Sequence, residues 1–203
     1  MKWIDVLAWF LFAFLCGSLP FSVWIGRWIL KVDIRQYGDK NPGTANVFRA
    51  GGRAWGVVAM LLDFLKGAIP VGLANWRSEL GYYGLALVAI APILGHAYSP
   101  WLGFRGGKAL ATTFGIWTGL TLWQGPTVLG ASLAFWSGLL VTDGWVILFG
   151  MLSFLAFLLL SEAPLYIVAV GILNAALLIW KYRQSLRQRL ITRKWIANLL
   201  RLG

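Results

Sequence analysis

A polar stretch in the middle of the chain, residues 95–108, gathers residue types that bind anions. It contains the only histidine, His96, and it ends on two cations and two glycines: Arg105, Gly106, Gly107 and Lys108. Paired glycines can turn successive backbone N–H groups toward one point, and a helix that begins near Lys108 would add its own unpaired N–H groups. The cations suit phosphate or carboxylate. The stretch therefore predicts an anion-binding loop, although a positively charged turn between two membrane helices fits the same residues.

A second polar segment, residues 33–53, is rich in glycine and contains an Asn-Pro pair, which favours turns. Thr44 and Asn46 have short polar side chains that can bond either the backbone or a ligand. Arg49 follows Asn46 by three residues, so both lie on one face if the segment is helical there. This loop can wrap a phosphate through Asn46 and backbone amides while Arg49 holds a second anion. A well-capped re-entrant turn would have the same composition.

Two charged residues, Asp63 and Lys66, lie inside an otherwise apolar segment and are three positions apart. That spacing lets them pair on one helix face, and charges within a membrane cost about 3 kcal/mol each. Lys66 is roughly 18 Å along the helix from Ala54, so the pair is expected to clamp the architecture rather than contact a substrate. His96 is a candidate general base, but a histidine at a helix end more often caps carbonyls or packs. No residues have the spacing of metal ligands, and neither a metal nor a cofactor is expected.

The elements that must position these residues are apolar helices. Of the 203 residues, 59% are hydrophobic and 12% are charged, which excludes a soluble domain and indicates a polytopic membrane protein. At about 20 residues per span, the all-α fold has seven transmembrane helices. Their expected ranges are 4–28, 54–74, 80–98, 108–123, 126–142, 145–161 and 163–181. Residues 1–181 form the membrane domain, Gly115 and Gly119 mark close helix packing, and residues 182–203 form a basic tail.

The distribution of cations predicts the orientation. With seven spans, most Lys and Arg residues fall in the segments 27–53, 105–108 and 181–201, all on one side. The positive-inside rule then places the N-terminus outside, the C-terminus in the cytoplasm and the structured or re-entrant loops toward the cytoplasm. The tail alternates cations with apolar residues, so residues 195–200 are expected to form an interfacial helix held to anionic lipid headgroups. Nucleic acid is not an expected partner of a membrane-tethered tail.

Three ordered motifs resemble the bacterial acyl-phosphate:glycerol-3-phosphate acyltransferase family, the PlsY type. They are Gly38-Asp39-Lys40-Asn41-Pro42-Gly43-Thr44-Ala45-Asn46-Val47-Phe48-Arg49, Asp63-Phe64-Leu65-Lys66-Gly67, and the run from Gly95-His96 to Thr112. Gly17-Ser18-Leu19-Pro20 is similar to the family's first-span signature. The resemblance implies a multi-pass enzyme of the bacterial inner membrane, with its active site toward the cytoplasm. Its substrates would be acyl phosphate and glycerol 3-phosphate, its products lysophosphatidic acid and phosphate, and it would need no cofactor.

The resemblance also implies roles for individual residues. The donor phosphate would be held by the segment Gly43, Thr44, Ala45 and Asn46. Glycerol 3-phosphate would be held by Arg49 and Lys108, with Arg105 and the Gly106–Gly107 backbone lining the site. Asn46, Arg49 and Lys108 would belong to the catalytic set, to which His96 is added as the candidate general base; the family is thought to need no protein base, because the donor's own phosphate takes the proton. After the last span, Tyr182 and Ser185 would contact substrate, where the family usually has a histidine and an asparagine.

The chain departs from the family pattern in the two loops. Asp39 replaces a serine, Ala45 replaces a threonine, and Lys40 and Ala109 replace glycines. An acid beside a phosphate site is repulsive unless a cation offsets it, and Lys40 or Arg35 is the expected partner. Two alternatives therefore stay open. One is a paralogue that uses another phosphorylated acceptor or only binds lipid phosphate; the other is a transporter of anionic solutes.

Overall fold

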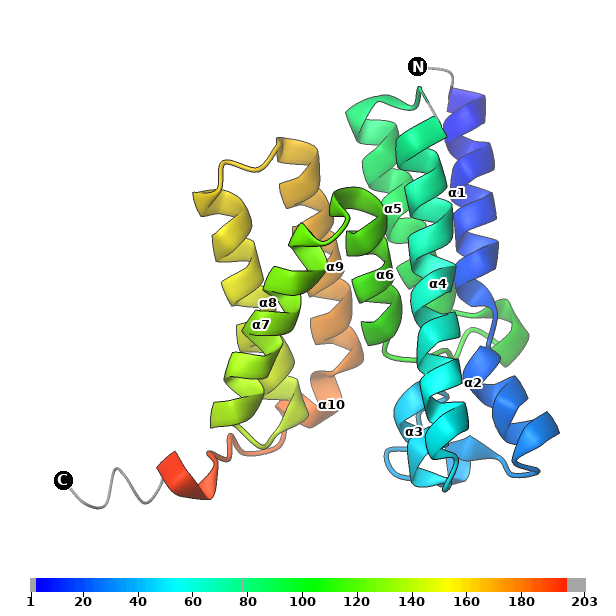
Figure 1. Cartoon of the computed structure of the whole chain (residues 1–203), viewed down its shortest axis with the longest axis vertical. Coiled ribbons are helices and arrows are strands. Elements are labelled where there is room, and N and C mark those ends of the chain that lie inside the picture. The colour runs from blue at the N-terminus through cyan, green and yellow to red at the C-terminus, as the bar shows by residue number, and fades with distance from the viewer. Residues whose placement is uncertain (1–2, 78, 197–203) are drawn as a thin grey trace. The chain divides into compact units, whose positions relative to one another are not determined.

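The computed structural model describes residues 3–77 and 79–196, and within these residues it consists of helices joined by loops (Figure 1). The chain divides into two compact units, Met1–Gly125 and Pro126–Gly203. The predicted all-α class is confirmed. Both loops with candidate site residues lie in the first unit, whereas Tyr182 and Ser185 lie in the second.

The first unit contains four longer helices and several short ones. They are α1 (Trp3–Ser18), α2 (Phe21–Trp24), η1 (Ile25–Ile29), η2 (Ile34–Gln36), α3 (Thr44–Arg49), α4 (Arg53–Arg77), α5 (Gly81–Ala97), η3 (Pro100–Leu102) and α6 (Leu110–Thr121). The span expected over 4–28 is interrupted, because α1 ends at Ser18 and α2 starts at Phe21. Pro20 explains the break, since it lacks an N–H group and restricts the residue before it. The break exposes the Leu19 carbonyl to a side chain of α4, described below.

Small residues bring the helices of this unit into close contact. A side chain on Gly17 would overlap the Pro92 carbonyl, so α1 and α5 meet without space for a methyl group. Gly115 lies against the Phe64 carbonyl in the same way, and Gly119 lies against Gly72, which joins α6 to α4. The close packing predicted for Gly115 and Gly119 is confirmed, and it fixes α6 relative to the helix that carries Asp63 and Lys66.

The loop between η1 and α4 packs against its neighbouring helices through a small apolar core. Ile34 and Val47 are completely buried, and they pack with three further buried residues, Val23, Ile25 and Ala59. Asp33 caps η2 by accepting the Arg35 backbone N–H, and its carboxylate pairs with the Arg35 guanidinium at 2.7 Å. This side-chain bond holds the pKa of Asp33 at about 2, below its usual value. The loop is therefore held as a folded segment that can present polar side chains in fixed positions.

The second unit contains α7 (Gln124–Leu139), α8 (Asp143–Leu160), α9 (Leu165–Lys181) and α10 (Arg183–Leu186), with α7 starting at the end of the first unit. The tail up to Ile196 runs along the connection between α7 and α8. The Val141 N–H donates to the Ile191 carbonyl at 2.8 Å, and the Arg193 N–H donates to the Leu139 carbonyl at 2.8 Å. The expected interfacial helix at 195–200 falls largely on residues 197–203, outside the described residues.

Four helical stretches in the described part of the chain are long and apolar enough to cross a bilayer: Trp3–Ile29, Arg53–Arg77, Gly81–Leu102 and Asp143–Leu160. α9 is apolar but shorter, with 17 residues, and α6 has 12. The structure thus supports a membrane protein. The count of seven spans and their orientation stay predictions, as does the separate domain at 182–203.

Candidate anion-binding site

Three of the predicted anion-binding side chains converge on one carboxylate, that of Asp39. Lys108 Nζ lies 2.6 Å from Asp39 Oδ2, and Asn46 Nδ2 donates to Asp39 Oδ1 at 3.0 Å. Arg49 Nη1 is 3.9 Å from Asp39 Oδ1 and donates to Asn46 Oδ1 at 2.8 Å. Residues Thr44–Arg49 form the helix α3, which is the condition under which Asn46 and Arg49 lie on one face. The structure therefore joins the first loop and the Gly-Gly loop at a position that binds an anionic group.

The cation that pairs with Asp39 differs from the one expected from the sequence. Lys40 or Arg35 was expected to offset its charge, and for Arg35 that expectation is wrong, since Arg35 pairs with Asp33. Lys108 is the partner instead. Burial would raise the pKa of Asp39, but the hydrogen bond and charge of Lys108 outweigh it, so the pKa lies below its usual value. The carboxylate is thus ionised at neutral pH, and Lys108, Asn46 and Arg49 converge on it.

The sequence suggested that the Gly106 and Gly107 N–H groups point toward an anion, but in the structure both donate to backbone carbonyls. The Gly106 N–H donates to the Ala97 carbonyl at 3.2 Å, and the Gly107 N–H donates to the His96 carbonyl at 3.0 Å. Both amides are used to satisfy carbonyls at the end of α5, which would otherwise lack partners. A side chain on Gly107 would overlap the His96 ring, so the glycines let the loop pack closely against α5.

The helix expected to start at Lys108 starts at Leu110, because Ala109 has a left-handed conformation with φ of 62°. Lys40 has a similar φ of 60°. Both residues stand where the resembling family has glycine, so the backbone keeps a glycine-type conformation at each position despite the side chain. The turn at Ala109 separates Lys108 from α6 and leaves its side chain in the loop.

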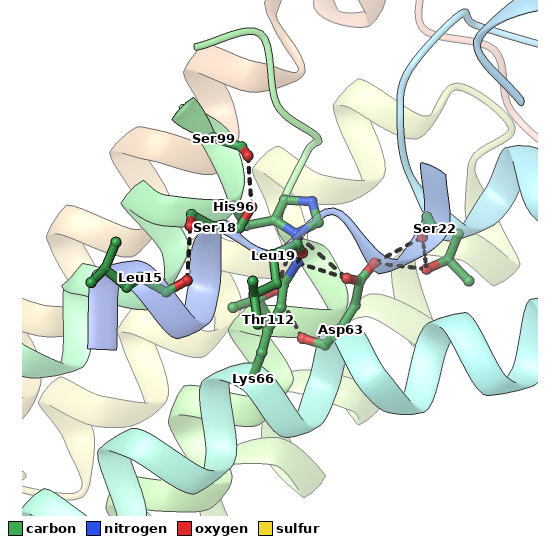
Figure 2. A network of polar contacts seen from close by, with 10 residues as sticks. Leu15, Ser18, Leu19, Ser22, Asp63, Lys66, His96, Ser99 and Thr112 are labelled. Carbon is green, nitrogen blue, oxygen red and sulfur yellow. Dashed lines mark hydrogen bonds and ion pairs between the residues drawn. The ribbon is translucent and has the colours of Figure 1, made fainter. Parts of the chain in front are cut away.

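A buried polar network lies at the break between α1 and α2 (Figure 2). Lys66 Nζ is 2.7 Å from Asp63 Oδ1 and donates to the Leu19 carbonyl at 2.8 Å. Asp63 Oδ2 accepts from the hydroxyls of Ser22 and Thr44, each at 3.1 Å. Only 3% of either charged side chain is exposed. The network thus connects the α1–α2 break, α2 and the start of α3 to α4 through one ion pair. These contacts hold the four segments in fixed positions relative to one another.

His96 belongs to this network rather than to the anion cluster. Its Nδ1 is 3.4 Å from Thr112 Oγ1 and 3.9 Å from Asp63 Oδ1, and the side chain is mostly buried. Thr112 donates to the Asp63 carbonyl at 2.9 Å. His96 therefore connects α5, α6 and α4, and its ring supports Gly107, one residue before Lys108.

The remaining predicted residues have other surroundings. Gly43 precedes α3 and its carbonyl accepts the Asn46 N–H at 3.0 Å, while Ala45 and Arg105 are exposed. In the second unit, Ser185 Oγ accepts the Gly144 N–H at 2.9 Å, and Tyr182 is buried. Their contacts with substrate stay predictions. Among the described residues, no cluster of His, Cys, Asp and Glu has the make-up of a metal site.

Sequence reasoning missed Ser22 as a member of the buried network. It lies two residues after Pro20, and its hydroxyl is 3.4 Å from Thr44 Oγ1. The available signal was a small polar residue in an apolar run, directly after a proline that interrupts a helix. A hydroxyl at such a position can hydrogen-bond a nearby backbone or side-chain group.

Fold and site together define the class: an all-helical membrane protein whose polar groups gather in two loops and one buried cluster. A profile of the glycerol-3-phosphate acyltransferase family matches residues 7–192. The chain belongs to this family.

Individual relatives agree with that assignment. Glycerol-3-phosphate acyltransferase 1 of Thermotoga maritima is 45% identical over 118 residues, which cover 57% of this chain and 58% of the relative. The corresponding protein of Anaeromyxobacter sp. is 47% identical over 116 residues, covering 54% of this chain and 56% of the relative. The chain thus aligns with a little over half the length of these relatives. The crystal structure of PlsY, an integral membrane glycerol 3-phosphate acyltransferase, in its glycerol 3-phosphate form is 31% identical with a TM-score of 0.78, covering 90% of both chains.

Proposed function

We propose that the protein transfers a fatty acyl group from acyl phosphate to the hydroxyl of glycerol 3-phosphate, giving lysophosphatidic acid and phosphate. The observation that carries the proposal is the convergence of Asn46, Arg49 and Lys108, from two separate loops, on a single anionic group. Family membership supports it, as do the similar crystal structures of PlsY in its glycerol 3-phosphate and lysophosphatidic acid forms.

In this proposal, Arg49 and Lys108 hold the phosphate of the acceptor, with Arg105 and the Gly106–Gly107 loop at its edge. The segment Gly43 to Asn46 holds the donor phosphate, and Tyr182 and Ser185 keep the substrate-contacting role that the resemblance implies for them. His96 acts as a positioning residue, because its ring lies against Gly107 and its Nδ1 faces Thr112 and Asp63.

The chemistry needs little more than positioning. The acceptor hydroxyl oxygen attacks the acyl carbon, the bond from that carbon to the phosphate oxygen breaks, and the hydroxyl proton passes to the departing phosphate. The donor is a mixed anhydride with a good leaving group. Cations that hold both phosphates therefore supply most of the rate by orienting the reactants and neutralising charge.

We also propose seven spans, with the N-terminus outside and the C-terminus and site loops in the cytoplasm, in a bacterial inner membrane. The clustering of cations in 27–53, 105–108 and the tail supports this orientation. The tail cations would contact anionic lipid headgroups.

The test is phosphate release by the purified protein in lipid, given palmitoyl phosphate with and without glycerol 3-phosphate. We expect acceptor-dependent release with lysophosphatidic acid formed. Lys108→Ala should lower turnover at least about 100-fold, as does loss of other groups that stabilise charge in transition states. Lys31→Ala, which removes a loop cation outside the cluster, is the control. Near-normal turnover in folded Lys108→Ala would contradict the site assignment.

A further inference from the structure

The carboxylate of Asp39 stands in the position where the proposed function needs a phosphate. Its oxygens form an ion pair with Lys108, accept a hydrogen bond from Asn46 and lie within 3.9 Å of Arg49 Nη1. Oδ1 also accepts the Asn41 N–H at 3.3 Å. Carboxylate and phosphate oxygens make the same charge-assisted bonds to ammonium, guanidinium and amide donors. The side chain thus occupies the anion position with a group of the same chemistry and a smaller charge.

We propose that Asp39 is an internal competitor for the anion, and that it makes the site selective for doubly charged phosphate groups over singly charged anions. The identity of the ligand as a phosphate monoester rests on the proposed function; the competition itself does not. A monoanion that displaces the Asp39 carboxylate only replaces one single negative charge with another, so its attraction to Lys108 and Arg49 is about the same and its net binding is weak. A phosphate dianion brings one more charge to Lys108 and Arg49, so it can displace the side chain.

The local backbone lets the side chain leave while the loop stays. Asp39 is flanked by two residues with left-handed backbone, Gly38 at φ of 53° and Lys40 at φ of 60°, and the Lys40 N–H closes a turn on the Tyr37 carbonyl at 3.0 Å. A side chain on Gly38 would press on Asn46 and Arg49, so the backbone at this point is held against the cluster. The Asp39 side chain itself is 38% exposed. Rotation about its side-chain bonds moves the carboxylate into solvent without unfolding the turn.

A purely organising role is the competing explanation. If Asp39 served only to hold Lys108 and Asn46 in place, removing its charge would loosen the cluster and weaken anion binding. If Asp39 competes, removing its charge would strengthen binding. The two explanations predict opposite signs for the same measurement.

The experiment measures binding of radiolabelled inorganic phosphate by equilibrium dialysis of the full chain in lipid nanodiscs. Asp39→Asn keeps the shape of the side chain, and we expect it to bind phosphate more tightly than the wild type, by up to about fivefold, the upper value for a partly exposed ion pair. Asp33→Asn is the matched control, because it removes a carboxylate from the same loop that pairs with Arg35 instead, and its affinity should equal that of the wild type.

Acetate gives a second readout. It should compete with phosphate in Asp39→Ala, where the carboxylate position is empty, and hardly at all in the wild type. Equal or weaker phosphate binding by both Asp39→Asn and Asp39→Ser, in protein with an unchanged melting temperature, would overturn the proposal, as would no detectable binding. Dialysis requires no turnover, so its result is read separately from the acyl-transfer assay. A protein that fails to transfer acyl groups can still confirm the competition.

Discussion

Replacing Lys66 with methionine should be among the most damaging single changes in the chain, because it leaves the Asp63 carboxylate buried without its counter-ion. The charged atoms are 2.7 Å apart and 3% of each side chain is exposed. At an effective dielectric constant of about 20 the lost attraction is roughly 6 kcal/mol. The hydroxyls of Ser22 and Thr44 stay bonded to Asp63 and offset part of it. Breaking one side of a buried pair typically costs about 3 to 5 kcal/mol, and we expect a loss in that range.

A second ion pair in the same unit provides the matched control. Arg35 and Asp33 are also 2.7 Å apart, but their side chains are 38% and 28% exposed. Arg35→Met should therefore cost no more than about 1 kcal/mol. Unfolding of each variant, followed by tryptophan fluorescence as denaturing detergent is added to lipid-solubilised protein, measures the difference. The double variant Asp63→Asn/Lys66→Met should recover more than half of the loss, because no buried charge remains. Equal losses for Lys66→Met and Arg35→Met would refute the reasoning that burial sets the cost.

Two further predictions concern the loops. Ala109→Gly should raise the free energy of unfolding by about 1 kcal/mol in the same detergent titration. The reason is that φ at this position is 62°, and a residue with a side chain is strained in this left-handed conformation. A loss of stability would show that the packing of the Ala109 methyl group contributes more than the backbone strain costs. The pKa of Asp33 is lowered to about 2, so its pairing contributes fully above about pH 5 and is lost as the pH falls toward 2. The difference in melting temperature between the wild type and Asp33→Asn should accordingly be constant at neutral pH and shrink below about pH 4, and a constant difference down to pH 2 would contradict the assignment.

Much of the helical layout follows from local sequence properties. The helix expected over 54–74 is observed as Arg53–Arg77, and the one expected over 80–98 as Gly81–Ala97. Hydrophobic runs of this length leave few alternatives. The shared helix face of Asn46 and Arg49 also follows from spacing alone, because the 44–49 segment needed only to become helical.

Contacts between distant segments did not follow from the sequence. Lys108 meets Asp39 across nearly seventy residues of chain, and nothing in either loop identifies the partner, since Lys40 is adjacent to Asp39 in sequence. The use of the Gly106 and Gly107 amides was also misread, because the carbonyls that accept them lie at the end of α5 and become neighbours only after the loop folds back. Spacing predicts which groups share a face; tertiary packing decides which partner each group takes.

The buried ion pair also contacts the helix that carries part of the anion cluster, through Thr44. Asp63 accepts a hydrogen bond from this first residue of α3, and α3 carries Asn46 and Arg49. On the other side, the Asp63 carbonyl holds Thr112. Asp63 is thus bonded both to α3, which carries Asn46 and Arg49, and to α6, the helix that follows Lys108 in the chain. A shift of α4 at Asp63 would move the two halves of the anion cluster relative to each other, and errors of about 1 Å in such a site reduce rates strongly. We therefore expect acyl transfer by folded Lys66→Met, measured as phosphate release, to fall by more than its loss of stability in the detergent titration explains.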